Sequence, residues 1–219
     1  MDAMNTNDYA ARIQVFRAHI EVMRHTPPFE VINWRVFKPM REASILQMEE
    51  YVAQHQDSPN FHVLPTMRPF YHVTTGWELT WVYWEPSPIT NNPPNGQSLL
   101  SGPGELYAPV DWAEQDIPYD EGYRVFDALS ANEEVVLKFH RGIDEPEFHL
   151  HHMPSDSYHP LALDFPTYMD LLLQTRGLSP WQHFFVTSPN FRIDDRTREG
   201  FLDNLRRLFP EADTSRFPH

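Results

Sequence analysis

The chain has 219 residues, 41% hydrophobic and 14% aromatic, so it is large enough to bury a sizeable core. It contains 17 Lys and Arg and 31 Asp and Glu, which gives a formal net charge of −14. This charge disfavours nucleic acid and anionic membranes as partners, because proteins bind both through clustered Lys and Arg. The absence of Cys from the sequence excludes disulfides, thiolate nucleophiles and zinc fingers.

The first 84 residues are predicted to form three helices and two strands. Two helices are indicated by apolar residues at helical spacing, and the third by Pro65 at its start and Gly76 as its C-cap. The strand that begins at Trp77 is indicated by alternating apolar residues. The expected helices span residues 9–25, 41–55 and 65–74, and the expected strands span 29–37 and 77–84.

The rest of the chain is predicted to contain a loop, several strands and two helices. Residues 85–104 are rich in Pro, Asn, Ser and Gly, which predicts a long loop. Strands are then expected at 105–112, 123–129, 134–140 and 148–152. Consecutive strands with short links favour an antiparallel meander. A helix is expected to start at Asp164 and Pro166 and to end at Gly177, and a last helix is expected at 196–209.

The order of helices, then strands, then helices indicates an α+β protein rather than a parallel α/β protein. We expect a single domain over residues 1–219, with a mainly antiparallel sheet of about four to six strands packed against helices. The core is expected at 60–187, with a helical N-terminal extension at 1–55 and a C-terminal helix and tail at 188–219. A cytoplasmic location is expected, because the sequence shows neither a secretory signal nor an apolar run of about 18 residues.

The acidic residues are unevenly placed along the sequence. Between Arg68 and Arg124 there are eight Asp and Glu and no Lys or Arg. Such a segment is either a solvated face that keeps the protein soluble or a docking surface for a basic partner. The residues expected to bind that partner are Glu105, Asp111, Glu114, Asp116, Asp120 and Glu121.

The stretch EPEFHLHHMP, residues 145–154, concentrates three histidines among carboxylates. One face of a strand here would carry Glu147, His149 and His151, and the other Phe148 and Leu150. A half-buried antiparallel strand needs this alternation whatever its polar residues do, and that interpretation is preferred. The alternative is that the three polar residues hold a metal ion, with His140 or His159 as a further ligand.

Other signatures of catalysis are missing from the sequence, which contains no nucleophile elbow, P-loop or dinucleotide-binding motif. The favoured interpretation assigns no catalytic residue, no metal and no cofactor. The adjacent carboxylates Asp194 and Asp195 are expected to cap the last helix. Trp77, Trp81 and Trp84 would line either a ligand cleft or, more commonly, the core.

Two stretches resemble the SUKH superfamily, which includes a fungal regulator of cell-wall glucan synthesis and many bacterial immunity proteins. LPTMRPFYHVTTGWELTW, residues 64–81, is similar to its first motif, with Thr75 where the superfamily usually has Asn. FPTYMDLLLQTRG, residues 165–177, followed by Trp181, is similar to its closing helix. Residues 123–127 and 134–137 fit its central strands.

This resemblance implies an α+β domain without catalytic machinery. Bacterial members are typically immunity proteins that bind and neutralise a toxin, often a nuclease, encoded nearby. The expected function is therefore a non-enzymatic immunity protein that binds a basic, nuclease-type toxin through an acidic surface. Two alternatives stay open, a metal-dependent enzyme that uses the His/Glu cluster and a regulatory scaffold protein like the fungal relatives. Neither nucleic acid nor a membrane is expected as a partner.

Overall fold

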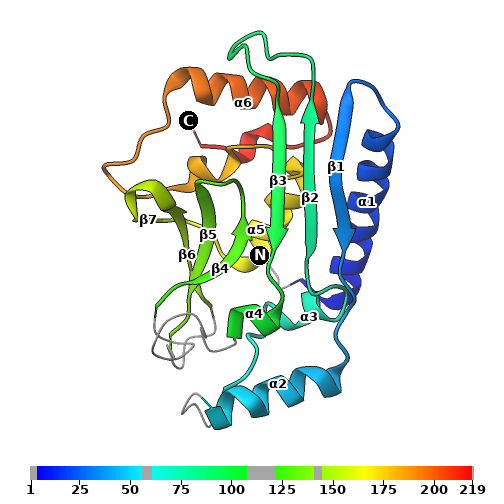
Figure 1. Cartoon of the computed structure of the whole chain (residues 1–219), viewed down its shortest axis with the longest axis vertical. Coiled ribbons are helices and arrows are strands. Elements are labelled where there is room, and N and C mark those ends of the chain that lie inside the picture. Colours follow the sequence, from blue (N-terminus) through cyan, green and yellow to red (C-terminus); the bar gives the residue numbers. More distant parts are fainter. Residues whose placement is uncertain (1–3, 56–60, 108–121, 141–144, 219) are drawn as a thin grey trace.

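The computed structural model of the chain describes residues 4–55, 61–107, 122–140 and 145–218 (Figure 1). The strands are β1 (Phe29–Val36), β2 (Trp77–Tyr83), β3 (Asn95–Leu100), β4 (Arg124–Ala128), β5 (Glu133–Lys138), β6 (Glu147–His152) and β7 (Ser157–Pro160). The helices are α1 (Thr6–Arg24), α2 (Glu42–His55), α3 (Arg68–Tyr71), α4 (Pro103–Tyr107), α5 (Phe165–Thr175) and α6 (Asp195–Leu208). Three 3-10 turns are η1 (Met153–Ser155), η2 (Trp181–Phe185) and η3 (Thr214–Arg216).

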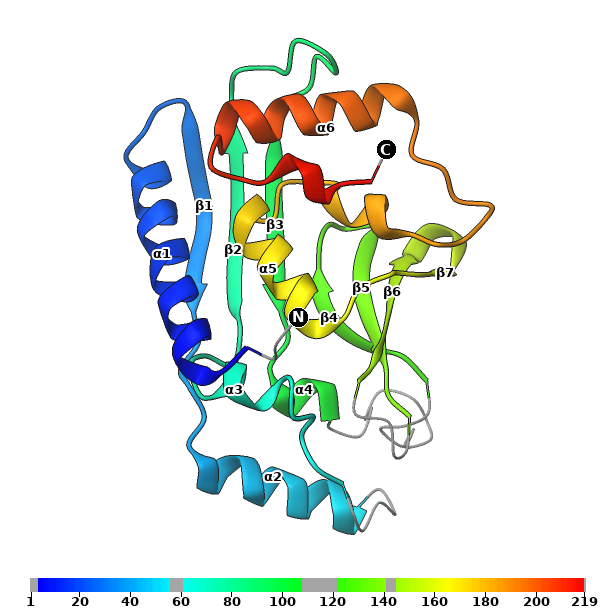
Figure 2. The same ribbon diagram turned by 180° about the vertical axis from the view of Figure 1, so that it is seen from behind.

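The described strands form one seven-stranded sheet in which every neighbouring pair is antiparallel. Their order in the sheet is their order in the chain, so the predicted meander extends from β1 to β7. Helices α1, α5 and α6 cover one face of the sheet (Figure 2). The opposite face, which is turned toward the viewer in Figure 1, carries no described helix. The expected α+β class is confirmed.

The core lies between the sheet and this helical layer. The ring of Phe16 on α1 lies 5.2 Å from that of Trp77, and Trp77 and Trp81 are 0% and 1% exposed. These two tryptophans therefore belong to the core, as the commoner interpretation predicted. Trp84 differs, because it is 58% exposed and its Nε1 donates a hydrogen bond to a carboxylate oxygen of Glu30 at 2.7 Å.

Local sequence signals set the ends of the C-terminal helices. The side chain of Asp164 accepts a backbone N–H of the first turn of α5 at 2.8 Å, and Asp194 does the same for α6 at 3.0 Å. Helix α5 ends where Arg176 and Gly177 adopt left-handed conformations, with φ of 52° and 70°. These caps and this end were predicted.

Residues 29–36 and α1 are integral to the sheet and the core rather than an extension of them. β1 pairs with β2 from Phe29 opposite Tyr83 to Val36 opposite Trp77. The buried side of α1 packs against β1 and against the core beside it. The boundary expected between residues 1–55 and a core at 60–187 does not divide the structure.

β3 lies inside the segment expected to be a loop. Its core-facing positions include Gly96 and Ser98, which are small because bulky side chains of β2 occupy the space beside them. A Cβ at Gly96 would lie 2.4 Å from Nε1 of Trp81. Ser98 Oγ accepts a hydrogen bond from Nε1 of Trp77 at 3.1 Å. A strand that makes room for neighbouring tryptophans loses the apolar alternation by which strands are predicted.

The strand expected at 105–112 is wrong in its described part. Pro103 begins α4 there, and the helix turns Leu106 and Tyr107 into the core at 0% exposure. Residues 108–112 lie outside the described residues. The short strand β7 was not predicted. Because β3 and β7 both belong to the sheet, it has seven described strands, whereas about four to six were expected.

The helix expected at 65–74 is shorter than predicted. Helix α3 spans four residues and its C-cap is His72. Gly76 instead turns the chain into β2 with a φ of 138°. A Cβ on Gly76 would lie 2.4 Å from the carbonyl oxygen of Leu100, so the position accepts only glycine without strain.

Candidate functional site

Of the expected partner-binding residues, the structure describes Glu105, which lies in α4 at the same end of the molecule as α2 (Figure 1). Glu105 is exposed in the first turn of α4, and among the described residues its carboxylate has no hydrogen-bond or ion-pair partner. The other five residues, Asp111, Glu114, Asp116, Asp120 and Glu121, lie outside the described residues. The chain enters that segment after Tyr107 in α4 and leaves it before β4, and α4 packs against β4.

A buried ion pair fixes α2 to the rest of the chain. The side chain of Glu49 is 6% exposed, and it accepts hydrogen bonds from the backbone N–H of Val63 at 2.8 Å and from Arg68 at 2.6 Å. Arg68 also pairs with Glu42, and this hydrogen bond holds the pKa of the Glu42 carboxyl below its usual range. Because Arg68 is committed to these two carboxylates, it does not neutralise the other acids at this end of the molecule.

Two open hollows lie beside α2 and α4, and Gly104 borders both. The first has a volume of about 380 Å³ and is lined by Ser44, Gln47, Met48, Tyr51, Val52, Gly104 and Tyr107. The second, of about 310 Å³, is lined by Phe37, Met40, Thr75, Gly102, Pro103, Gly104 and Glu105. On α2, Leu46 and Tyr51 are 52% and 46% exposed. We call the surface formed by Met40, Leu46, Met48, Tyr51, Gly104 and Glu105 the α2/α4 surface.

The net charge is segregated along the chain. Residues 188–219 contain six Lys and Arg and six Asp and Glu, so the whole formal charge of −14 belongs to residues 1–187. The electroneutral segment contains α6, which lies at the end of the molecule opposite α2 (Figures 1 and 2). The α2/α4 surface is therefore at the end of the molecule away from most of the arginines of the C-terminal segment.

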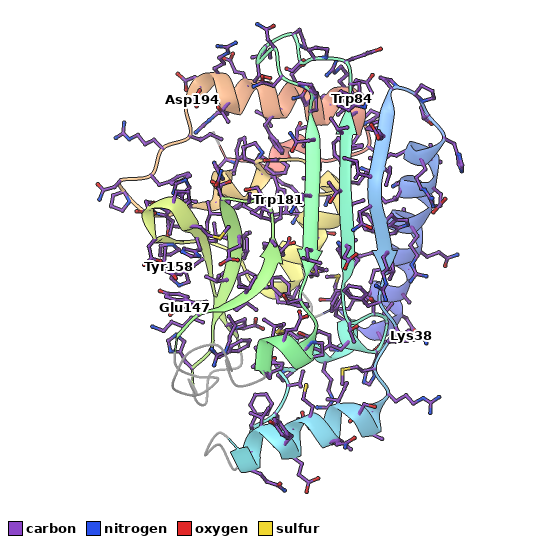
Figure 3. All side chains as sticks on the ribbon, viewed as in Figure 1. Lys38, Trp84, Glu147, Tyr158, Trp181 and Asp194 are labelled. Carbon is purple, nitrogen blue, oxygen red and sulfur yellow. The ribbon has the colours of Figure 1, made fainter. Side chains whose placement is uncertain are left out.

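β6 carries the histidine cluster on the sheet face that no described helix covers. Phe148 and Leu150 point into the core and are 1% and 0% exposed, as predicted, but His149 between them is also buried, so the strand is not half-buried as expected. Glu147 begins β6, and the edge strand β7 pairs with β6 from His149 to His152 (Figure 3).

The carboxylate of Glu147 lies between two histidines. Its oxygens are 3.3 Å from Nε2 of His140 and 3.4 Å from Nε2 of His149. The hydrogen bond with His149 lowers the pKa of Glu147. His149 is 7% exposed, with the ring of Tyr123 packed edge-on at 5.0 Å, and burial lowers the pKa of its imidazole. These groups form a partly buried polar cluster, whereas a solvent-exposed strand face was expected.

His151 belongs to a separate cluster. Its ring stacks on that of Tyr158 with centroids 4.2 Å apart, and Tyr158 stacks in turn on Tyr123 at 4.2 Å. The two ring nitrogens of His151 lie 2.9 Å from a carboxylate oxygen of Glu134 and 3.2 Å from one of Asp156. This stack could not be predicted from the sequence, because its rings come from three separate segments.

The three residues considered as metal ligands thus contact different partners. Glu147 and His149 contact each other, whereas His151 contacts Glu134 and Asp156. Over residues 4–55, 61–107, 122–140 and 145–218, the structure brings together no group of three His, Asp or Glu with the geometry to hold a metal ion.

An ionisable group that the sequence analysis did not single out lies in the core. Asp127 is 0% exposed and accepts hydrogen bonds from the hydroxyls of Tyr168 at 2.7 Å and Ser98 at 2.9 Å. Burial raises the pKa of Asp127 to about 7. The carboxyl connects β4 to β3 and α5. An Asp within the apolar stretch RVFDA was the available sequence signal.

The helical face carries an apolar groove of about 330 Å³ between α1 and α5, bordered by Val15, Phe16 and Leu173. The charged groups along the groove are already paired with one another. Arg12 forms an ion pair with Asp170, and Arg176 forms one with Glu211.

No family model, curated protein or solved structure matches the chain. The resemblance to the SUKH superfamily therefore rests on its motifs, of which residues 64–81 run from the turn before α3 through most of β2, and residues 165–177 form α5 and its C-terminal turn. No helix in the part of the chain that the structure describes is long and apolar enough to cross a membrane.

Proposed function

We propose that the protein is a non-enzymatic immunity protein of the SUKH type, which neutralises a basic, nuclease-type toxin by binding it with the α2/α4 surface and the adjoining acidic segment. One observation carries this proposal. The end of the molecule at α2 and α4 combines the carboxylate of Glu105, which no described residue pairs, with the exposed side chains of Leu46 and Tyr51, in a chain whose excess of acid lies within residues 1–187.

The two kinds of side chain have different roles in such a complex. Carboxylates attract a basic partner over distances of about 10 Å at moderate salt and raise the association rate. Exposed aromatic and Met side chains supply the apolar contacts that slow dissociation, and both are enriched in protein interfaces. A nuclease presents a basic cleft to its substrate, and an acidic protein competes for that cleft through complementary charge.

The experiment is a capture of partners from the native host on the immobilised protein, at low and at high salt, read by mass spectrometry. A single basic protein that salt elutes is the expected result. Expression of that partner alone is expected to stop cell growth, and co-expression of this protein is expected to restore it. A partner that is captured but harmless would instead favour the regulatory scaffold.

Charge reversal tests the surface itself. The variant Glu105→Lys is expected to slow association with the captured partner several-fold, because it reverses a carboxylate within the contact area. Glu199→Lys, an exposed position on α6, changes the net charge equally and is expected to leave association nearly unchanged. Equal rates for the two variants would rule out the α2/α4 surface as the docking site. Reversal of Asp116, Asp120 and Glu121 to Lys extends the same test to the acidic segment.

A further inference from the structure

A pocket of different character lies beside α6. It has a volume of about 290 Å³ and lies where η2, the segment before α6 and the end of the chain meet. Its lining residues are His183, Phe184, Val186, Phe191, Arg192, Ile193, Arg198 and Pro218. The volume is just below the range of about 300–1,000 Å³ that is typical of small-molecule sites, so the pocket suits a small ligand.

Two arginines of this pocket lack an acceptor within the described chain. The Nε of Arg198 is buried and unsatisfied, and its guanidinium lies over the ring of Phe184 at 6.0 Å. Arg192 is exposed at the pocket and likewise forms no hydrogen bond or ion pair with a described residue. Three of the other four arginines of the C-terminal segment are engaged, Arg196 with the carbonyls of Ile89 and Thr90, Arg207 with Asn204, and Arg216 with Asp170, and the fourth, Arg206, is exposed outside the pocket.

No Asp or Glu is among the described residues that line the pocket, and two acids of the elements beside it are paired with other groups. Glu133 lies 3.0 Å from Nε2 of His183, and this hydrogen bond lowers the pKa of Glu133. The carboxylate of Asp194 accepts hydrogen bonds from the backbone N–H and the hydroxyl of Thr197. The two guanidinium groups of the pocket therefore constitute a local excess of positive charge in a protein of net charge −14.

A buried guanidinium N–H without an acceptor is costly, and native proteins rarely leave one unsatisfied. An anion in the pocket would satisfy it and would compensate the charge of both arginines. Apart from His183, which is paired with Glu133, the other lining side chains are apolar, with Phe184 and Phe191 offering ring faces and edges. The complementary ligand has one anionic group and one apolar body.

We propose that this pocket binds a small organic anion, whose carboxylate or phosphate contacts Arg198 and Arg192 and whose apolar body packs against Phe184 and Phe191. The site is separate from the α2/α4 surface and does not depend on the function proposed for that surface.

Calorimetric titration of the full chain tests the proposal with defined probes: benzoate, phenyl phosphate, inorganic phosphate and the neutral benzyl alcohol. Saturable binding of benzoate or phenyl phosphate, with one molecule per chain, is the expected result. Benzyl alcohol is expected to bind at least about ten-fold more weakly, since it offers the arginines no charge. The tighter of the two aromatic anions identifies the ligand as a carboxylate or a phosphate.

Three variants localise the site. Arg198→Gln and Arg192→Gln are each expected to raise the Kd of the preferred probe by about ten-fold or more. Arg206→Gln, an exposed arginine of α6 outside the pocket, is expected to bind as the wild type does. If Arg198→Gln does not fold, the exposed Arg192→Gln decides. Absence of saturable anion binding, equal binding of benzyl alcohol, or equal binding by Arg192→Gln and Arg206→Gln would overturn the proposal.

Discussion

At the scale of single residues, the most consequential group is the buried carboxyl of Asp127. Its hydrogen bonds with Tyr168 and Ser98 favour the charged form, but burial opposes that form more strongly, so the pKa rises to about 7. The folded protein thus keeps a proton that the unfolded chain has released, and the energetic cost appears in the dependence of stability on pH.

The sign follows from the two pKa values of Asp127, about 7 when folded and 3.8 in its ordinary environment. The stability that the protonated Asp127 contributes is complete below about pH 4, falls as the pH rises to about 7 and is level above that. The free energy of unfolding lost over this range is about 4 kcal/mol at most. The variant Asp127→Asn cannot ionise. Its free energy of unfolding in urea, relative to the wild type, is therefore expected to rise between about pH 4 and 7 and to be level above that.

Two further variants check this assignment. Tyr168→Phe removes a hydrogen bond that favours the ionised carboxyl, so it is expected to move the fall in stability to higher pH. Glu199→Gln neutralises an exposed acid on α6 and is expected to follow the wild type at every pH. A slope for Asp127→Asn that matched the wild type would show that Asp127 does not titrate in this range.

At the scale of elements, the sequence predicted the helices and strands whose own residues form the core. It did not predict the elements whose residues are determined by packing against neighbouring elements. α1 and α5 were predictable because their apolar residues and end signals are local. β3 was hidden because Gly96 and Ser98 make room for tryptophans of β2. The exposure of Glu105 was predictable from its charge. The stack of Tyr123, His151 and Tyr158 was not predictable, because its rings belong to segments that only the folded sheet brings together.

The turn into β2 offers a sharp test at this scale. Gly76→Ala is expected to cost about 2–4 kcal/mol of stability, because alanine would need the φ of 138° and its Cβ would meet the carbonyl of Leu100. Gly104→Ala is the matched control, since a Cβ there meets nothing within 4 Å. It is expected to be neutral or to stabilise α4 by up to about 1 kcal/mol. Equal losses in urea unfolding for the two variants would contradict the strained geometry at Gly76.

At the scale of the whole molecule, charge opposes compactness. A chain of net charge −14 repels itself when folded, and salt screens that repulsion. Raising the NaCl concentration at about pH 8 is therefore expected to move urea unfolding to higher denaturant concentrations. The shift is expected to shrink near the isoelectric point of about 5.2. A shift of the same size at both pH values would mean that salt acts other than by screening.

The order of strands in the sheet also has an evolutionary consequence. Strands that are neighbours in the chain are neighbours in the sheet, so a connection between them can lengthen or be replaced without altering any pairing. The connection from β3 to β4 contains α4 and all six acidic residues proposed to contact the partner. Descendants of one ancestral gene can thus exchange this single insert and acquire a new partner, while the sheet and its helical layer are inherited intact.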